Sequence, residues 1–412
     1  MSRVKEKYLE DDQMGYISGK NFNVCEKHFD EKDILKFILE NGDTNLKCSF
    51  CDETEDDIEI TTKITWDDLL GRIVPCIKNF YDDPANGLSY VSAEGGYLGN
   101  TYDTLELLQD VIGIDAEFEV VEEIANSITQ EFWTEAEFYG ETYTDHLNYT
   151  WEAFSDLVKY KVRYVFNEVE VKSNNYDSSH KPFLILKDIG RFITQLNLII
   201  TVPEKSNFFN QYIFFQRARQ HKATDKVSAC QDIGSAPNNF AGANRFSAEG
   251  ISIFYGAENE DTAINEVINV EKKDEFISIG NFYPAKELNL IDLRNIPKIG
   301  FFDTENIKLI EPARFLKMFV ESISQKLEKD GNERIEYIPS QIVTEYLRHV
   351  LPTSLKRTVH GIVYKSVQNA NKDCYAIFAD RFQCSDEGED HAETLLILKR
   401  DSIKKLRVSE IE

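Results

Sequence analysis

The sequence predicts an α+β protein, in which a mainly helical N-terminal half precedes a half that mixes strands and helices. Apolar residues recur largely at helical spacings from about residue 66 to residue 203. From residue 211 onward, short β-like runs and helical segments follow one another without a regular strand–helix–strand order. Neither GxGxxG nor GxxxxGK followed by Ser or Thr occurs, so neither standard phosphate-binding loop is present. These observations favour α+β over a doubly wound parallel sheet.

Composition narrows the class of protein further. A chain of 412 residues with 42% hydrophobic residues is long enough for two or three domains. Its net charge of −26 argues against nucleic-acid binding, because phosphate contacts require clusters of Lys and Arg. No apolar run approaches the roughly 18 residues of a membrane span, and the N-terminus lacks the apolar core of a secretory signal. We therefore expect a cytoplasmic protein without membrane contact.

Three parts are predicted: an N-terminal segment over residues 1–62, a helical domain over 63–205 and a mixed domain over 206–412. The acidic stretch 52–62 has the composition of a linker. Within the helical part, residues 87–99 and 173–180 are polar or Gly-rich and are expected to be loops.

The N-terminal segment contains two closely spaced pairs of metal-ligand residues. These are Cys25-x-x-His28 and Cys48-x-x-Cys51, which flank an amphipathic helix predicted over residues 30–40. Their spacing and softness predict a zinc site with three Cys ligands and one His ligand. Because all four ligands are protein groups, the site would be structural; the alternative is that the pairing is coincidental. The chain has seven cysteines, an odd number, and their spread does not indicate a disulfide framework, so reduced thiols are expected.

The C-terminal part is expected to alternate short strands and helices. A β-like aromatic run over 212–215 is followed by a loop over 225–239. Strands are predicted over 251–257, 276–282, 288–293, 361–365, 375–379 and 395–398. Helices are predicted over 305–327, over 342–351, and after Asp261, which we expect to be an N-cap.

The stretch 242–267 combines a turn, a strand and a helix, and it carries three side chains with chemical potential. Arg245 in the turn suits a phosphate, Tyr255 on the strand suits a stacked ring, and Glu266 on the helix suits a ribose hydroxyl or an oxocarbenium-like transition state. Each also has an ordinary structural interpretation: a surface salt bridge, a sheet aromatic and a solvated carboxylate. Their order and spacing favour the functional interpretation.

In this arrangement the chain resembles the RES domain family. Tyr255 follows Arg245 by ten positions and Glu266 follows Tyr255 by eleven, as in the family signature. Residues 216–219, 338–341 and 361–366 also resemble RES motifs, so the resemblance covers about residues 211–402. Two positions depart from the usual pattern: Asn244 stands where Gly commonly precedes the signature Arg, and Lys365 stands where a small residue or Pro is commoner.

The resemblance implies a fold similar to ADP-ribosyltransferase toxins and an enzyme that degrades NAD. The nicotinamide–ribose bond would be cleaved with water or inorganic phosphate as acceptor, and many members are toxins paired with an antitoxin. The family's active-site trio matches Arg245, Tyr255 and Glu266, and its downstream serine matches Ser366. Three further residues are expected to bind the substrate: Arg217, Phe246 and Tyr364.

The region before residue 206 resembles the HEPN-type region that precedes some RES domains. The RNase motif of other HEPN proteins, an Arg followed a few residues later by His, is absent between residues 66 and 203. This region is therefore expected to be structural, regulatory or oligomerising, with an antitoxin or regulatory protein as a partner. Two alternatives to NAD degradation stay open: transfer of ADP-ribose to a macromolecule, and non-catalytic sensing of NAD.

Overall fold

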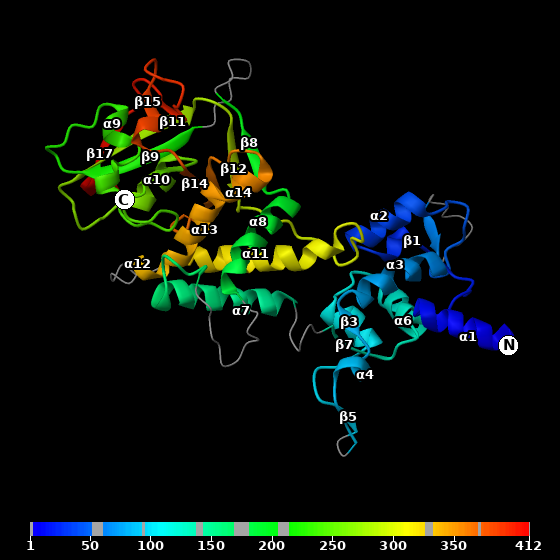
Figure 1. The fold of residues 1–412 in the computed structure, drawn as a ribbon. Coiled ribbons are helices and arrows are strands. Elements are labelled where there is room, and N and C mark those ends of the chain that lie inside the picture. The colour runs from blue at the N-terminus through cyan, green and yellow to red at the C-terminus, as the bar shows by residue number, and fades with distance from the viewer. Residues whose placement is uncertain are drawn as a thin grey trace. The chain divides into compact units, whose positions relative to one another are not determined.

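The computed structural model describes residues 3–51, 61–92, 95–136, 143–168, 181–204, 214–325, 333–369 and 372–411. The chain divides into two compact units, which are described separately (Figure 1). The first comprises Met1–His146 and Lys298–Glu311, and the second comprises Leu147–Pro297 and Pro312–Glu412. The units do not follow the three predicted parts, whose boundaries stay a prediction. Within the described ranges, no helix combines the length and apolar character that a membrane crossing requires.

The first unit is mainly helical, as predicted for the N-terminal region. Its longer helices are α1 (Arg3–Met14), α2 (Lys32–Asn41), α3 (Trp66–Lys78) and α6 (Phe118–Ser127), with short turns α4 (Pro84–Gly87), α5 (Thr104–Glu106) and η2 (Leu107–Val111). The predicted helix 30–40 corresponds to α2 and ends at Gly42. Thr65 caps α3 by accepting a hydrogen bond from the Asp68 N–H.

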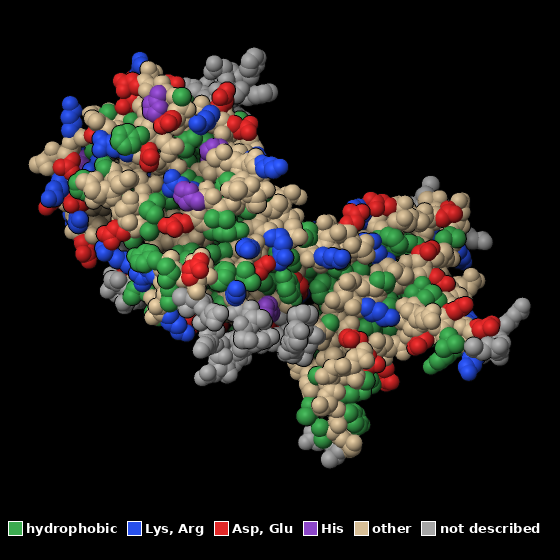
Figure 2. Space-filling model, in the orientation of Figure 1, with side chains coloured by type: hydrophobic (Ala, Val, Ile, Leu, Met, Phe, Trp, Pro, Cys, Tyr) green, Lys and Arg blue, Asp and Glu red, His purple; other side chains and the backbone are tan. Residues whose placement is uncertain are grey.

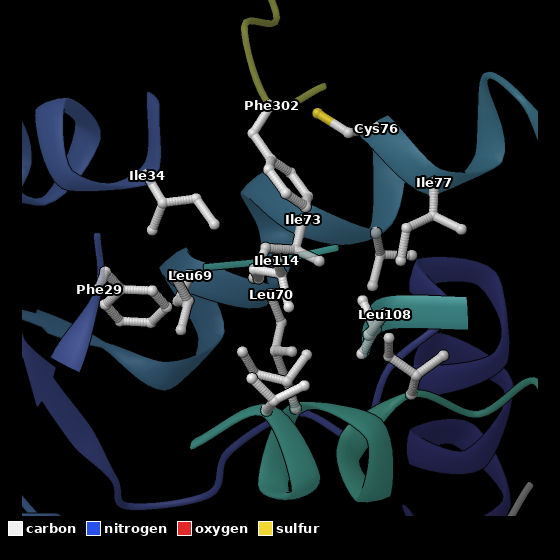
Figure 3. Packing of buried hydrophobic residues seen from close by; sticks show 14 of the residues in the cluster. Phe29, Ile34, Leu69, Leu70, Ile73, Cys76, Ile77, Leu108, Ile114 and Phe302 are labelled. Atoms are coloured by element: carbon white, nitrogen blue, oxygen red, sulfur yellow. The ribbon is translucent and has the colours of Figure 1, made fainter. Parts of the chain in front are cut away.

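The core of the first unit surrounds α3. Leu69, Leu70, Ile73 and Ile77 are fully buried along one side of this helix (Figure 3). Phe302, from the segment Lys298–Glu311, points into the same cluster and is also buried. Burial of this ring explains why a segment so distant in sequence belongs to the first unit.

Short strands complete the first unit. Strands β1 (Asn23–Cys25) and β2 (Lys63–Thr65) pair antiparallel, as do β4 (Tyr90–Val91) and β5 (Gly96–Tyr97). A small sheet joins β3 (Tyr81–Asp82), β7 (Phe132–Glu135) and β6 (Tyr102–Asp103) in that order. The helical pattern of the sequence did not reveal these strands, which are at most four residues long.

The second unit is built on one large mixed sheet, as the α+β prediction requires at this coarse level. Its order is β15-β16-β11-β9-β10-β14-β13-β12-β8, with β17 also paired to β11. Only β12–β13 and β15–β16 pair in parallel among these strands. The strand bounds are β8 Ile199–Val202, β9 Phe215–His221, β10 Phe254–Ala257, β11 Phe276–Pro284, β12 Leu288–Asp292, β13 Gly361–Lys365, β14 Asp373–Ile377, β15 Cys384–Asp386, β16 Leu396–Leu398 and β17 Lys404–Arg407.

Helices accompany the sheet in the second unit. They are α7 (Tyr143–Asp156, continued by η3, Leu157–Lys161), α8 (Ile185–Gln195), α9 (Cys230–Ile233), α10 (Glu260–Val267), α11 (Ile310–Ile323), α12 (Glu333–Glu336), α13 (Ile338–His349) and α14 (Leu351–Leu355). The first residues of α7 and α11 belong to the first unit.

Acidic and basic side chains are intermixed over the visible face of the molecule (Figure 2).

Several predicted boundaries are wrong. The N-cap of α10 is Asn259 rather than Asp261, because the Asn259 side chain accepts from the Thr262 N–H at 2.9 Å while Asp261 lies inside the first turn. Helix α13 begins at Ile338, four residues before the predicted start, since Pro339 fits the first turn of a helix. Strand β10 begins only at Phe254.

Other strands were missed or lie partly outside the described residues. Strand β8 falls in the stretch predicted as helical, and β9 extends through the Arg-containing segment as far as His221. Strands β15 and β17 were not predicted. The predicted loop 173–180, most of the linker 52–62 and the start of the β-like run at 212 lie outside the described residues.

Candidate active site

One cavity of the second unit brings the signature residues together. It has a volume of about 360 Å³, and its lining includes Arg245, Tyr255 and Glu266. Tyr364 from β13 and Cys374 from β14 complete part of its wall. This volume lies within the range of small-molecule sites, which is roughly 300–1,000 Å³.

The turn that carries Arg245 is closed by main-chain hydrogen bonds. The Asn244 N–H donates to the Ser247 carbonyl at 2.8 Å, and the Ser247 N–H donates back to Asn244 at 3.2 Å. Asn244 is not among the residues with a positive φ, so the replacement of the usual Gly places no strain on the turn.

Helix α13 holds this turn from the other side. The Gln341 amide donates to the carbonyls of Asn244 at 2.8 Å and Ser247 at 3.1 Å. The Ser340 hydroxyl donates to the Arg245 carbonyl at 2.7 Å. The motif at 338–341 therefore fixes the main chain around Arg245, a function that sequence reasoning did not assign to it.

The guanidinium of Arg245 is oriented by backbone carbonyls. It donates to the carbonyl of Ile323, the last residue of α11, and, at 3.0 Å, to that of Gln325, two residues beyond the helix. The Tyr337 ring lies 5.9 Å from the guanidinium carbon. Because these bonds leave further N–H groups on the guanidinium, Arg245 keeps the capacity to bind an anion in the cavity.

Two tyrosines, Tyr255 and Tyr364, line the cavity. The Tyr255 hydroxyl lies 3.0 Å from the Ser247 hydroxyl. Burial raises the pKa of Tyr255 and raises that of Tyr364 well above the usual value, so both phenols are neutral hydrogen-bonding groups. Phe246, predicted to bind substrate, is instead buried against the Tyr364 ring at 4.8 Å, and it does not line the cavity.

Glu266 is exposed at the cavity and is held in place by Ser366. The Ser366 hydroxyl donates to Glu266 Oε1 at 2.6 Å, and the Cys374 thiol lies 3.7 Å from the same oxygen. The backbone N–H groups of Gln368 and Asn369 donate to Ser366 Oγ at 3.2 and 2.9 Å. Since two donors occupy the oxygen of Ser366, its own proton is directed to the carboxylate.

The Arg217 side chain lies on the face of the sheet opposite to Gln216 and Tyr255. In the pairing of β9 with β10, Gln216 faces Ala257, so Arg217 shares the other face with Phe254. Its guanidinium lies 4.9 Å from the Phe254 ring centre and donates to the carbonyls of Ile233 and Tyr255, both at 2.8 Å. Arg217 is among the residues that line the cavity, and its two hydrogen bonds go to backbone carbonyls, so a contact between its side chain and the substrate stays a prediction.

A charge network lies next to Ser366 and accounts for the unusual Lys365. The Lys365 ammonium pairs with Asp373 at 2.8 Å, and Arg294 bridges Asp373 and Asp292. Hydrogen bonds from Lys365 and Arg294 hold the pKa of Asp373 below its usual value, although burial acts in the opposite direction. The network joins β12, β13 and β14 at the end of the sheet that carries Ser366.

A second candidate site lies in the first unit. The ligand atoms of Cys25, His28, Cys48 and Cys51 all lie within 4.8 Å of one another. His28 Nε2 lies 3.4 Å from Cys48 Sγ and 3.3 Å from Cys51 Sγ, and His28 Nδ1 lies 2.6 Å from a carboxylate oxygen of Glu117. Tetrahedral zinc places such ligand atoms roughly 3.4–3.8 Å apart. The donor set therefore fits a tetrahedral metal ion, with Glu117 orienting the imidazole.

The fold and the cavity define a mixed α/β protein with a small-molecule site lined by Arg, Tyr and Glu. A comparison with protein families matched residues 41–172 to HEPN/RES N-terminal domain 1 and residues 215–396 to the RES domain. The chain thus contains a RES domain over residues 215–396, preceded by a HEPN/RES N-terminal domain over residues 41–172. Comparisons with curated proteins and with solved structures gave no match. The RES family is linked to NAD-related toxin–antitoxin systems, so the match supports an NAD-related role.

Sequence reasoning missed several residues of the site. Tyr337, Gln216 and Cys374 line the cavity, and Gln341 fixes the Arg245 turn. Gln341 and Gln216 both lie in motifs that the sequence singled out, 338–341 and 216–219, but placing the Gln216 side chain in the cavity required the strand register. The remaining two carry no local signal, because they enter the cavity from distant segments.

Proposed function

We propose that the protein degrades NAD by cleaving the bond between nicotinamide and ribose, within an ADP-ribosyltransferase-like RES domain. The observation that carries this proposal is the presence of Arg245, Tyr255 and Glu266 on one cavity in a chain that contains a RES domain. A guanidinium, an aromatic face and a carboxylate are the groups that a dinucleotide with a cationic pyridinium ribose requires.

The proposed mechanism begins with loss of nicotinamide. The bond between C1′ and the pyridinium nitrogen breaks, its electron pair leaves with nicotinamide, and the ribose becomes oxocarbenium-like. The carboxylate of Glu266 stabilises this positive charge, and Ser366 holds the carboxylate in position through its 2.6 Å hydrogen bond. Arg245 binds the pyrophosphate, and Tyr255 or Tyr364 supplies a face for the nicotinamide ring.

The acceptor completes the reaction. Attack by water on C1′, with loss of a proton, gives ADP-ribose; attack by inorganic phosphate gives its 1-phosphate. Both acceptors use the same arrangement of side chains, so the proposal covers NAD glycohydrolase and NAD phosphorylase chemistry.

Product analysis tests the proposal. The purified protein is incubated with NAD, with and without phosphate, and nicotinamide and the ribose product are followed by mass spectrometry. The proposal predicts equal amounts of nicotinamide and of ADP-ribose or its 1-phosphate. Label from NAD on protein or nucleic acid would instead establish an ADP-ribosyltransferase, and NAD binding without nicotinamide release would establish a sensor.

We also propose that Cys25, His28, Cys48 and Cys51 hold a structural zinc ion. The closed set of four protein ligands and the carboxylate contact to His28 support this assignment. The metal would join Cys25 and His28, at β1 and the turn after it, to Cys48 and Cys51 in the loop after α2, and it would take no part in the reaction. An antitoxin partner, oligomerisation through the helical region and a cytoplasmic location stay predictions from sequence.

A further inference from the structure

Gln216 is a cavity residue that the mechanism above does not use. It lies on β9 and lines the cavity together with Tyr255 and Glu266. Its register partner on β10 is Ala257, so its side chain shares the sheet face of Ala257 and Tyr255. Two residues of a strand span about 6.6 Å. Gln216 and Tyr255 are therefore neighbouring residues on the sheet face that lines the cavity.

The side-chain oxygen of Gln216 lacks a hydrogen-bond partner among the described residues. Its Oε1 is buried without a hydrogen bond, and the other buried side-chain atoms in this condition, Glu26 Oε2, Thr61 Oγ1 and Arg72 Nε, belong to the first unit. Gln216 thus supplies the only such atom in the described part of the second unit. By contrast, Gln220 on the same strand bonds both the N–H and the carbonyl of Asn269.

A buried amide oxygen without a partner destabilises the folded protein unless a ligand donates a hydrogen bond to it. The complementary ligand group is a primary carboxamide, because it offers one N–H donor and one carbonyl acceptor to the acceptor and donor of Gln216. The terminal torsion of Gln is broad, so the amide plane turns at low cost to pair with both atoms.

We infer that Gln216 binds the carboxamide of nicotinamide and makes the enzyme specific for the amidated dinucleotide. This inference rests on the proposed function, and it adds a specificity-determining residue to it. A nicotinate carboxylate presents only acceptors, so one of its oxygens would face Gln216 Oε1 without a proton between them. The same cavity also contains Glu266, whose negative charge further disfavours a carboxylate.

The test compares NAD with its nicotinic acid analogue, deamido-NAD, in kcat/KM and in equilibrium binding. The wild-type protein is expected to favour NAD. Gln216→Leu should lower kcat/KM for NAD by roughly 10- to 100-fold and leave deamido-NAD within about 3-fold, so the discrimination between the two substrates collapses. Gln220→Leu, a change of the same type on the same strand and face, should leave the ratio unchanged.

Other outcomes would overturn the inference. Equal preference of the wild-type protein for the two dinucleotides would do so, as would equal losses for both in Gln216→Leu, which is the result expected from general damage to the fold. Binding is also measured in a Glu266→Gln background, where turnover is minimal. If the wild-type protein releases no nicotinamide from NAD, the proposed function fails, while the binding ratio still decides whether Gln216 recognises the carboxamide.

Discussion

The metal-ligand cluster of the first unit and the cavity of the second use polar side chains in opposite ways. In the cluster, Cys25, His28 and Cys48 are buried, and their donor atoms face one another. In the cavity, Glu266 is exposed, and the side-chain oxygen of Gln216 has no hydrogen-bond partner among the described residues. A site whose groups complete one another stabilises a fold, whereas a site with unmatched groups requires a ligand.

Removal of a metal ligand should have the largest effect on stability, because it breaks the cluster in which the donor groups complete one another. Cys48→Ser should abolish stoichiometric zinc and lower the melting temperature of the first unit by roughly 10 °C or more, because metal binding is coupled to folding. Metal content by mass spectrometry and calorimetry measure this change. The matched control is Cys230→Ala, a buried thiol of the second unit, which should keep the metal. A Cys48→Ser protein that still binds one zinc ion per chain would refute the closed-cluster interpretation.

The second change removes charge from the open site. Glu266→Gln should lower kcat for nicotinamide release by roughly 100-fold or more and leave the melting temperature unchanged, because the exposed carboxylate acts on the transition state and not on the fold. The control is Glu260→Gln, which changes another carboxylate of the same helix and should retain activity. Comparable activity of Glu266→Gln and the wild-type protein would show that the carboxylate is not part of the catalytic site.

The third change concerns the charge network beside the cavity. Asp373→Asn should reduce the free energy of unfolding of the second unit by about 2 kcal/mol at neutral pH, since it leaves Arg294 and Lys365 with an incomplete set of partners.

The pH dependence follows from the lowered pKa of Asp373. Its stabilisation is complete above the pKa of an unfolded Asp, about 3.9, and is lost as the pH falls through the lower folded-state pKa. The difference between wild type and Asp373→Asn should therefore be constant from about pH 5 to pH 8 and shrink below about pH 4. Asp274→Asn, at an exposed position, should show no such difference. A difference that grew on acidification would contradict the network.

The smallest effect is expected from the residue that positions Glu266. Ser366→Ala should reduce kcat by about 10-fold with little change in KM, because the carboxylate loses one charge-assisted hydrogen bond but keeps its charge. Ser354→Ala, which removes a helix hydroxyl bonded to Leu351, should leave both constants unchanged. A change in KM alone would place Ser366 in substrate binding instead of in the support of Glu266.

How much the sequence predicted differs between the two sites for a physical reason. The ligand pairs at 25–28 and 48–51 each lie within one turn, so the chemistry of Cys and His was sufficient to propose the cluster. Arg245, Tyr255 and Glu266 lie on a turn, a strand and a helix, and only the family pattern indicated that they meet. Alternation along β9 places the side chains of Arg217 and Gln216 on opposite faces of the sheet, which depends on a register that sequence alone does not give.

The fold shows the same limit. The amphipathic segments that form α2 and α11 were recognised as helices over 30–40 and 305–327, because their periodicity extends over several turns. Strand β8 was missed, since its four residues carry too little alternation and its place depends on pairing with β12. The segment Lys298–Glu311 belongs to the first unit because Phe302 is buried in the core of that unit, and local sequence patterns do not encode this packing.

One measurement tests most directly whether the guanidinium, the phenol and the carboxylate act on a single dinucleotide. It is a crystal structure of the Glu266→Gln protein, which should bind NAD without rapid turnover, grown with NAD. In this structure the pyrophosphate of NAD is expected at Arg245, the nicotinamide ring beside Tyr255, and C1′ of the nicotinamide ribose next to residue 266. NAD bound outside this cavity, or a cavity that stays empty at saturating NAD, would contradict that expectation.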